Sequence, residues 1–550
     1  GAHFINLDGR NGVIFRVWAP NAITVSLVGD FNNWNQKANY MYKIGGGVWE
    51  LFIENLNEFA VYKFCIETVD HTNILKSDPF AFHCQTRPEN ASMVFNTNQY
   101  VWHDSYWMEN RQNTSSPDKP MNIYEIHAGS WKKYPDGNYF NYQKMADELI
   151  PYLKEMNYTH VQLMPLMEYP YDPSWGYQTT GYFAATSRYG TPCDLMALID
   201  RCHMEGIGVI MEIVPSNFPK DDYGLYKFDG TCLYEDNNPK KGQRDSWGTC
   251  LFNFQRYEVI SFLISAVMFW FDKYHIDGMR IGAVSSMLYL DYGKKDGEWV
   301  PNRFGGNENL EAIDFIKRLN KAVHMYHPSA LTFAEENTSW PKLTLPIEEG
   351  GLGFDYKWNM GWMNDTLKYF EEDPLYRKDH HGKLTFSFMY AFSENYVLPL
   401  SHDDVVHGKK SIVNKMPGFF GAQLANVRAL YSYQMLHPGK KLNFMGNDFA
   451  QGLEWRFYEQ LEWQLLDREE NKKVQDYCRA LNKMYLKEKA LWEDSWDTFE
   501  WIEHENHNGN TITFLRKTKD NSEKIIGIFN FSGESKIGYK IGVPEDKIYR

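Results

Sequence analysis

Eight short apolar segments between residues 121 and 445 constrain the fold of this chain more than any other feature of its sequence. They lie at residues 121–126, 160–164, 208–214, 275–284, 330–334, 353–357, 396–400 and 442–445, and helical patterns such as those at 142–157 and 257–274 alternate with them. Regular strand–helix alternation favours a parallel sheet with right-handed crossovers. We therefore predict an α/β fold with a (β/α)8 TIM barrel over residues 121–474.

Two regions outside the barrel show mainly strand patterns. Residues 1–105 contain β-type segments at 12–18, 23–28 and 61–66, which predict an N-terminal β-sandwich. A polar linker is expected at 106–120. After a helical pattern at 474–485, strands at 511–515 and 524–529 predict a C-terminal β-sandwich over 475–550. Because the chain starts without Met and ends at Arg550 within an expected strand, we expect this sandwich to be truncated.

The composition argues against several classes of partner. A net charge of −14 disfavours nucleic acid and anionic membranes, because both bind surfaces rich in Lys and Arg. No apolar run approaches the roughly 18 residues of a membrane-spanning helix. The seven cysteines are scattered without a C-x-x-C pair, which is typical of reduced thiols in the cytoplasm rather than of disulfides or a zinc site. We therefore expect a cytoplasmic protein with a neutral ligand, no metal and no organic cofactor.

Polar residues follow three of the expected strands, at the barrel face where this fold places its chemistry. Arg280 and Gly282 lie toward the carboxyl end of the fourth strand, Glu335 follows the fifth, and His402 and Asp403 follow the seventh. Carboxyl groups at strand ends are candidates for glycoside chemistry, in which one acts as nucleophile and another, roughly 5 Å away, as acid and base. Taken alone, the adjacent glutamates Glu335 and Glu336 are better explained as solvated charge on a surface loop. The pair His402-Asp403 is by itself weak evidence for a catalytic site.

Longer motifs give the chain a family resemblance. It resembles the glycogen (1,4-α-glucan) branching enzymes of the α-amylase superfamily, glycoside hydrolase family 13, at residues 175–178 (WGYQ), 305–311 (GGNENLE), 356–359 (YKWN), 401–412 (SHDDVVHGKKSI) and 444–452 (FMGNDFAQG). The resemblance covers nearly the whole chain. It implies cleavage of α-1,4 bonds and formation of α-1,6 bonds in glycogen biosynthesis, with an α-glucan such as glycogen, amylose or starch as partner.

The resemblance also implies roles for individual residues. Glu335 is expected to be the catalytic acid and base, and Arg280 to orient a nucleophile at position 282. Tyr177 is expected to stack on the sugar at the cleaved bond. His402 and Asp403 are expected to bind its hydroxyl groups.

Tryptophans of the N-terminal region are further candidates. Residues 15–20, 29–34 and 47–50 are similar to the carbohydrate-binding sandwich that precedes the barrel in branching and debranching enzymes. Trp34 and Trp49 are therefore candidate glucan platforms. A buried sandwich tryptophan is an equally consistent interpretation of either, and the aromatic content of 16% by itself favours core packing.

The chain departs from the family pattern at the expected site. Gly282 stands where the family has an aspartate nucleophile, Asn217 where it has a histidine, and Glu212 where it has an aspartate. Asn217 and Glu212 are still expected to contact substrate. Several coincident changes favour a natural, impaired paralogue over a single inactivating mutation. We therefore hypothesise a branching-enzyme-like protein with impaired catalysis; the alternatives are a non-catalytic glucan-binding pseudoenzyme and, with less support, an α-glucan hydrolase.

Overall fold

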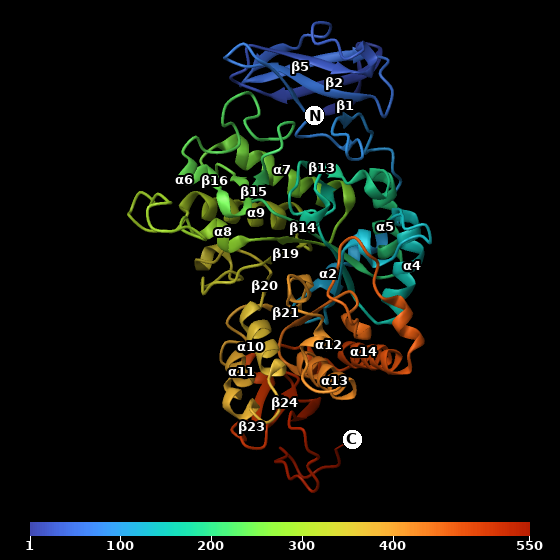
Figure 1. Cartoon of the computed structure of the whole chain (residues 1–550), viewed down its shortest axis with the longest axis vertical. Coiled ribbons are helices and arrows are strands. Elements are labelled where there is room, and N and C mark those ends of the chain that lie inside the picture. Colours follow the sequence, from blue (N-terminus) through green and yellow to red (C-terminus); the bar gives the residue numbers. More distant parts are fainter. Residues whose placement is uncertain (550) are drawn as a thin grey trace.

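A closed barrel of eight parallel strands forms the centre of the molecule (Figure 1), which confirms the predicted fold class. The computed structural model describes residues 1–549, the side chain of Ser115 excepted, so Arg550 of the expected C-terminal sandwich lies outside the described residues. The barrel strands are, in order, β10 (Asn122–Ile126), β11 (His160–Leu163), β14 (Gly208–Ile213), β18 (Gly278–Ile281), β19 (Leu331–Ala334), β20 (Tyr356–Trp358), β21 (Tyr396–Leu400) and β22 (Lys440–Phe444). Strand β22 pairs with β10 and closes the barrel.

The sixth strand begins later than its apolar pattern predicts. The prediction placed it at 353–357, whereas β20 starts at Tyr356. Gly353 has a φ of 79°, which is the left-handed backbone of a turn. The chain is therefore still turning at Gly353, and the extended backbone starts only after the turn is complete.

Helices surround the barrel on its outside (Figure 1). The main ones are α4 (Tyr142–Glu155), α5 (Pro192–Met204), α7 (Tyr257–Tyr274), α9 (Leu310–Tyr326), α10 (Met360–Glu371) and α13 (Phe420–Leu436). Helix α5 begins where its signals predict, since the Thr191 side chain accepts a hydrogen bond from the backbone N–H of Asp194. Helix α7 is apolar on most sides because the N-terminal sandwich covers part of its surface, with Phe269 stacked on Phe82 at 5.2 Å. Among residues 1–549, no helix is both long and apolar enough to span a membrane.

The N-terminal sandwich lies at one end of the long axis (Figure 1). One sheet has the order β1-β2-β5-β4, and the other contains β3, β6, β9 and β8, with β7 paired to β6. The strands are β1 (Ala2–Leu7), β2 (Arg10–Trp18), β3 (Thr24–Gly29), β4 (Tyr42–Gly45), β5 (Val48–Glu54), β6 (Val61–Glu67), β7 (Asn73–Lys76), β8 (His83–Cys84) and β9 (Ser92–Met93). Phe15 of one sheet meets Tyr62 of the other edge to face at 4.9 Å in the core.

One lysine fastens this sandwich to the barrel. Lys76 is 3% exposed, and its ammonium group donates to the carbonyl oxygens of Asp222 (2.5 Å), Gly224 (3.2 Å) and Tyr226 (2.7 Å) in the loop after β15 (Asn217–Pro219). Burial lowers the pKa of Lys76 to about 8. The three carbonyl oxygens satisfy the ammonium group in place of water and hold β7 against the barrel loop.

The segment expected to be a polar linker is partly helical and packed. It contains α1 (Ser105–Asn110) and α2 (Gln112–Ser115). Trp107 is 7% exposed and donates from its indole to Asp277 Oδ1 at 2.8 Å, and Arg111 donates to the carbonyl of Ile276 at 3.1 Å. The prediction weighed the polar residues of 113–120 and overlooked these two anchors. The segment therefore closes the amino end of the barrel.

The C-terminal all-β domain is confirmed at the opposite end of the molecule (Figure 1). Its described part forms one antiparallel sheet of β23 (Phe499–Glu503), β24 (Thr511–Lys517) and β25 (Lys524–Asn530). Helix α14 (Glu469–Lys487) leads into it and runs without interruption through residue 474, where the domain boundary was placed. Arg516 of β24 donates to the carbonyl of Leu436 at 2.8 Å and so ties the sheet to the end of α13.

Candidate active site

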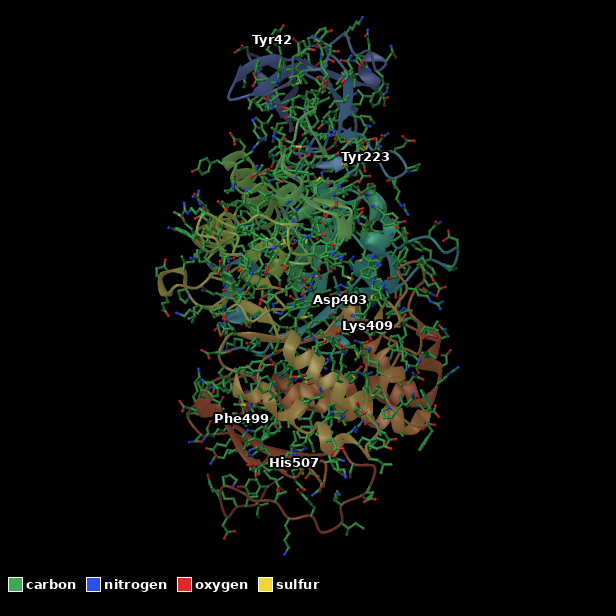
Figure 2. The ribbon with its side chains drawn as sticks, turned by 60° about the vertical axis from the view of Figure 1, so that its left-hand side comes forward. Tyr42, Tyr223, Asp403, Lys409, Phe499 and His507 are labelled. Carbon is green, nitrogen blue, oxygen red and sulfur yellow. The ribbon has the colours of Figure 1, made fainter. Side chains whose placement is uncertain are left out.

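A pocket of about 260 Å³ lies at the carboxyl ends of the barrel strands. Asp403, which lines it, lies midway along the molecule between the two terminal domains (Figure 2). The pocket brings together most of the residues that the sequence predicted, namely Tyr177, Asn217, Arg280, Gly282, Glu335, His402 and Asp403. Residues far apart in the chain meet here because parallel barrel strands all end at the same face.

Arg280 is the central charged group of the pocket. It belongs to β18, is 1% exposed, and lies over the ring of Trp358 at 4.1 Å. Its guanidinium group pairs with Glu212 on one side and donates to Glu335 Oε2 at 2.9 Å on the other. Burial opposes its charge, but Glu212 and the other acidic neighbours outweigh burial and raise the pKa of Arg280. Arg280 therefore stays charged and connects the floor of the pocket with its wall.

Gly282 directly follows β18 and lines the pocket. Its N–H donates to the carbonyl of Ile213 at 2.9 Å. A Cβ atom built on Gly282 would lie 3.2 Å from Val214 Cγ2 and 3.7 Å from Glu335 Oε2. Only the contact with Val214 is tight, so a side chain here needs a small shift of one valine methyl group. The structure around position 282 has room for the start of a side chain that this chain does not supply.

Glu335 follows β19 and has its carboxyl group above Gly282. Its Oε2 accepts hydrogen bonds from Arg280 Nη2 at 2.9 Å and from the backbone N–H of Ala283 at 3.0 Å. Ala283 has a φ of 54°, an uncommon conformation for a residue with a side chain, and this turn aims its N–H at Glu335. Two donors thus hold the carboxyl group of Glu335 in a fixed position at the pocket wall.

His402 and Asp403 follow β21 on the opposite side of the pocket. His402 Nδ1 donates to Glu125 Oε1 at 2.6 Å, and its Nε2 lies 3.4 Å from Asp403 Oδ1. Burial opposes protonation, but Asp403 and Glu125 outweigh it and raise the pKa of His402 to about 10. Burial also disfavours the charge of Asp403, yet His402 and Arg280 lower its pKa. The pair therefore presents an imidazolium and a carboxylate to the pocket.

Tyr177 packs beside this pair. Its ring stacks on His402 at 5.6 Å, and its hydroxyl group donates to Glu212 Oε2 at 2.6 Å. The Lys409 ammonium group donates to the backbone carbonyl of Asp403 at 2.7 Å, and both residues are seen together in Figure 2. His402 and Glu212 thus hold the ring of Tyr177 in place, and an aromatic ring fixed in this way is suited to stacking on a sugar ring.

Glu212 and Asn217, which were both expected to contact substrate, lie at different depths in the site. Glu212 is 0% exposed, and its carboxylate is occupied by Gln162 at 2.8 Å, Tyr177 and Arg280. It lies beneath the pocket, where it contacts Tyr177 and Arg280, and its expected contact with substrate stays a prediction. Asn217 does line the pocket, although its amide donates to Ser216 Oγ at 2.8 Å.

The two sandwich tryptophans lie away from the barrel pocket and differ from each other. Trp34 is 38% exposed, and its indole donates to Asp30 Oδ1 at 2.8 Å. Trp49 is 7% exposed, and its indole donates to the carbonyl of Ala19 at 2.9 Å. A glucan platform needs an exposed ring face, so the burial of Trp49 favours its packing interpretation. Trp34 remains a candidate.

Sequence reasoning missed several residues that shape the pocket. The carboxylate of Glu125 in β10 accepts hydrogen bonds from both the ring N–H and the backbone N–H of His402. Gln162 of β11 supports Glu212, and Trp358 of β20 lies under Arg280. A lone Glu or Gln within an apolar strand was the available signal for the first two, because a polar side chain inside a barrel needs a partner. Among residues 1–549, no group of three or more His, Cys, Asp or Glu side chains forms a metal-ligand set.

Comparisons with known families agree with this architecture. Residues 1–81 match carbohydrate-binding module 48 (isoamylase N-terminal domain), residues 144–229 match the α-amylase catalytic domain, and residues 501–550 match the α-amylase C-terminal all-β domain. A solved pullulanase from Bacillus acidopullulyticus shares the fold, with a TM-score of 0.72 over 96% of this chain and 69% of that chain, at 18% identity.

Curated relatives are much more similar in sequence. The chain is 52% identical over its full length to a protein of Halothermothrix orenii named 1,4-alpha-glucan branching enzyme GlgB, of which it covers 88%. It is 53% identical over its full length to a protein of the same name from Fusobacterium nucleatum, of which it covers 87%.

Proposed function

We propose, from the premise that this chain belongs to the 1,4-α-glucan branching enzyme family, that its barrel pocket binds α-1,4-glucan chains and cleaves them only slowly. The observation that carries the proposal is Gly282, which lines the pocket with no carboxylate to offer. The candidate sugar-binding residues Tyr177, His402 and Asp403 and the candidate acid Glu335 line the same pocket. The protein is then a branching-enzyme-like component of cytoplasmic glycogen metabolism with impaired catalysis.

The binding part of the proposal rests on three features of the pocket. Tyr177 supplies an aromatic face, and the charged His402 and Asp403 supply a donor and an acceptor for sugar hydroxyl groups. The side-chain amide of Asn217 also lines the pocket. These groups are suited to a neutral ring with several hydroxyl groups, which agrees with the net charge of −14.

The impaired chemistry follows from the number and positions of the carboxyl groups. Retention at an anomeric carbon requires a nucleophilic carboxylate facing a carboxyl acid across the bond. Glu335 supplies the acid and base. Glu212 is buried beneath Tyr177 and bound by Arg280, and Asp403 is engaged with His402, so neither replaces a carboxylate at position 282. Glu335 can then protonate a leaving oxygen, but the covalent intermediate lacks its protein partner.

A branching assay on amylose tests this proposal. We expect the unmodified chain to change iodine staining and α-1,6 linkage content on the order of 10⁴-fold more slowly than Gly282→Asp, the difference typical of a missing nucleophile. Gly282→Asn is the matched control, because it adds a side chain of the same size without a carboxylate. It should remain slow.

Three outcomes decide between this proposal and its alternatives. Rapid branching by the unmodified chain would contradict the impaired chemistry and assign the nucleophile to another residue. Glucan binding without gain of branching in Gly282→Asp would favour the alternative function, a non-catalytic glucan-binding protein, because the rest of the pocket would then also be unable to support catalysis. Release of free sugar in place of branch points would indicate a hydrolase.

A further inference from the structure

One side of the candidate active site is built by a segment that leaves the barrel after β14. We call residues 217–251 the wall segment. Its antiparallel sheet has the order β15-β17-β16, with β16 at Gln243–Arg244 and β17 at Thr249–Leu251. Three of its side chains line the pocket, namely Asn217, Trp247 and Thr249. None of the three belongs to a barrel strand, so their positions depend on what holds the wall segment.

Trp247 gives this side of the pocket an aromatic face. It is 41% exposed, and the guanidinium group of Arg244 lies over its ring at 4.6 Å. Arg244 is itself buried and donates to the carbonyl oxygen of Tyr292 at 2.9 Å. In the sheet, Asn217 pairs with Leu251, which belongs to the strand that follows Trp247. The pocket-lining residues are thus linked inside the wall segment, and a shift of the segment shifts them together.

The wall segment also packs on the N-terminal sandwich, at the end of β7. The Lys76 ammonium group donates to the carbonyl oxygens of residues 222, 224 and 226. The backbone N–H of Ser77 donates to the carbonyl oxygen of Tyr223 at 2.8 Å, and Figure 2 shows Tyr223 where the sandwich meets the barrel. The sandwich therefore holds the backbone of the wall segment only a few residues after Asn217.

The charges at this contact are complementary. Burial lowers the pKa of Lys76. The carboxylates that oppose this effect all belong to the wall segment, namely Glu235, Asp222 and Asp229. Glu235 is buried, and its Oε2 has no hydrogen-bond partner among residues 1–549. Asp229 Oδ2 also accepts a hydrogen bond from the backbone N–H of Asn21 at 2.9 Å. The sandwich thus supplies the cation and the wall segment supplies the anions.

We propose that Lys76 positions the pocket wall, so that the N-terminal sandwich sets where Asn217 and Trp247 meet a bound glucan. Lys76 does not line the pocket, so it acts through the wall segment. This inference rests on the proposed function, because it takes the pocket as a glucan site. Without the ammonium group, three buried carbonyl groups lose their donor and Glu235 loses a neighbouring cation. The loop at 222–226 then relaxes, and Asn217 moves because it begins the strand that leads into this loop.

Coupling between two sites is reciprocal, because each contact changes the free energy of the other by the same amount. A glucan that holds Asn217 and Trp247 in place therefore also stabilises the contact of β7 with residues 222–226. The sandwich and the pocket are then linked even when no glucan binds to the sandwich itself.

Binding of maltoheptaose to the full chain and to Lys76→Met tests the proposal. Methionine keeps an unbranched chain but has no charge and no donor. We expect the dissociation constant to rise by about fivefold or more, the lower end of couplings between protein sites, and hydrogen–deuterium exchange to become faster in peptides from 243–251. Lys440→Met is the matched control. Lys440 is also 3% exposed and donates to three backbone carbonyl groups, but it begins β22 at the amino end of the barrel.

The control separates positioning from general loss of stability. The affinity of Lys440→Met for maltoheptaose should equal that of the unmodified chain. Unchanged affinity of Lys76→Met would overturn the proposal. An equal loss of affinity in Lys76→Met and Lys440→Met would also overturn it, because the loss would then follow from removing any buried lysine.

The unmodified chain provides a second measurement, which does not depend on the folding of Lys76→Met. Maltoheptaose should slow exchange in peptides from 73–77 and 222–226, although neither stretch lines the pocket. This protection should vanish in Tyr177→Ala, which removes the stacking face of the pocket. Protection that persists in Tyr177→Ala would place the glucan on the sandwich and overturn the coupling.

The same experiment distinguishes this inference from the proposed function. Protection of pocket peptides from 175–178 and 402–407, with none at 73–77 and 222–226, would overturn the coupling and leave the proposed function standing. Lack of protection at 175–178 and 402–407 would contradict the proposed function itself.

Discussion

At position 282 the backbone does not require glycine. A Cβ there would meet Val214 at 3.2 Å and Glu335 Oε2 at 3.7 Å, and Gly282 lies outside the left-handed region. The surrounding groups, Arg280 and the N–H of Ala283, are both donors and both contact Glu335. The local environment is thus suited to an anion, and only the side chain that would supply one is missing.

This suggests that an external anion restores part of the chemistry. With α-glucosyl fluoride as donor, we expect azide or formate to speed fluoride release on the order of tenfold or more, because a small anion can enter beside Gly282 and attack the anomeric carbon. The product with azide should be the β-glucosyl azide. Fluoride release and product configuration are measured directly.

Gly282→Ala is the control for this rescue, since its methyl group occupies the space that the anion needs. Equal rescue of Gly282→Ala, or an α-configured product, would contradict the idea. At this scale the sequence predicted Glu335, His402 and Asp403 from their places after strands, and Tyr177 and Arg280 from the family resemblance. It did not predict Glu125, because the partner of that residue, His402, lies 277 residues away in the chain.

Among the elements, α1 depends on a buried charge cluster at the amino end of the barrel. His203 of α5 donates from its two ring nitrogens to Asp104 at 2.8 Å and Asp277 at 2.9 Å. Burial opposes its protonation, but Asp277 and Asp104 outweigh burial and raise the pKa of His203 to about 9. Asp104 immediately precedes α1, and Asp277 also accepts from Trp107, so one imidazolium joins α1, α5 and β18.

The raised pKa predicts a pH dependence of stability. Because the folded pKa of about 9 exceeds the unfolded value of 6.5, the contribution of His203 is complete below pH 6.5 and is lost as the pH rises through 9. The shift corresponds to roughly 3 kcal/mol. We expect the free energy of unfolding in urea to fall more between pH 6.5 and 9 for the unmodified chain than for His203→Gln.

A nearby histidine provides the matched control. His103 pairs with Asp200, but its side chain is 63% exposed, so His103→Gln should leave the pH dependence unchanged. Parallel pH profiles of the unmodified chain and His203→Gln would refute the role of the cluster.

The sequence predicted α5 from its cap but did not predict this cluster. The burial of Trp107 and Arg111 depends on where α1 packs against the barrel, and the local polarity of the sequence does not show this.

For the whole molecule, the order of three domains was predictable because each has its own local period, alternating strands and helices in the middle and strands alone at the ends. The way the terminal domains attach was not, since single contacts such as that of Lys76 with the loop at 222–226 carry no pattern in the sequence. Figure 1 shows the result, an elongated molecule with the N-terminal sandwich and the C-terminal domain at opposite ends.

A whole-molecule prediction concerns Trp34 of the N-terminal sandwich. We expect the full chain to be retarded in native gels that contain glycogen, and Trp34→Ala to reduce this retardation, because the 38% exposed ring offers a stacking face. The melting temperature should change little. Tyr106→Ala, with a ring that is 80% exposed on a different surface, controls for general loss of an aromatic side chain. Unchanged mobility of Trp34→Ala would exclude this residue as a glucan contact.

The attachment of Lys76 has a consequence for how a long polymer would meet this protein. With its ammonium group enclosed by three carbonyl oxygens, and with Phe82 stacked on Phe269, the sandwich cannot pivot freely on the barrel. If the N-terminal sandwich binds one part of a polysaccharide strand, the rest of that strand is tethered near the barrel pocket. Its effective concentration at the pocket then depends on the length of the strand and not on the bulk solution. Weak individual contacts would add up to avidity for long or branched polymers and leave short oligosaccharides poorly retained.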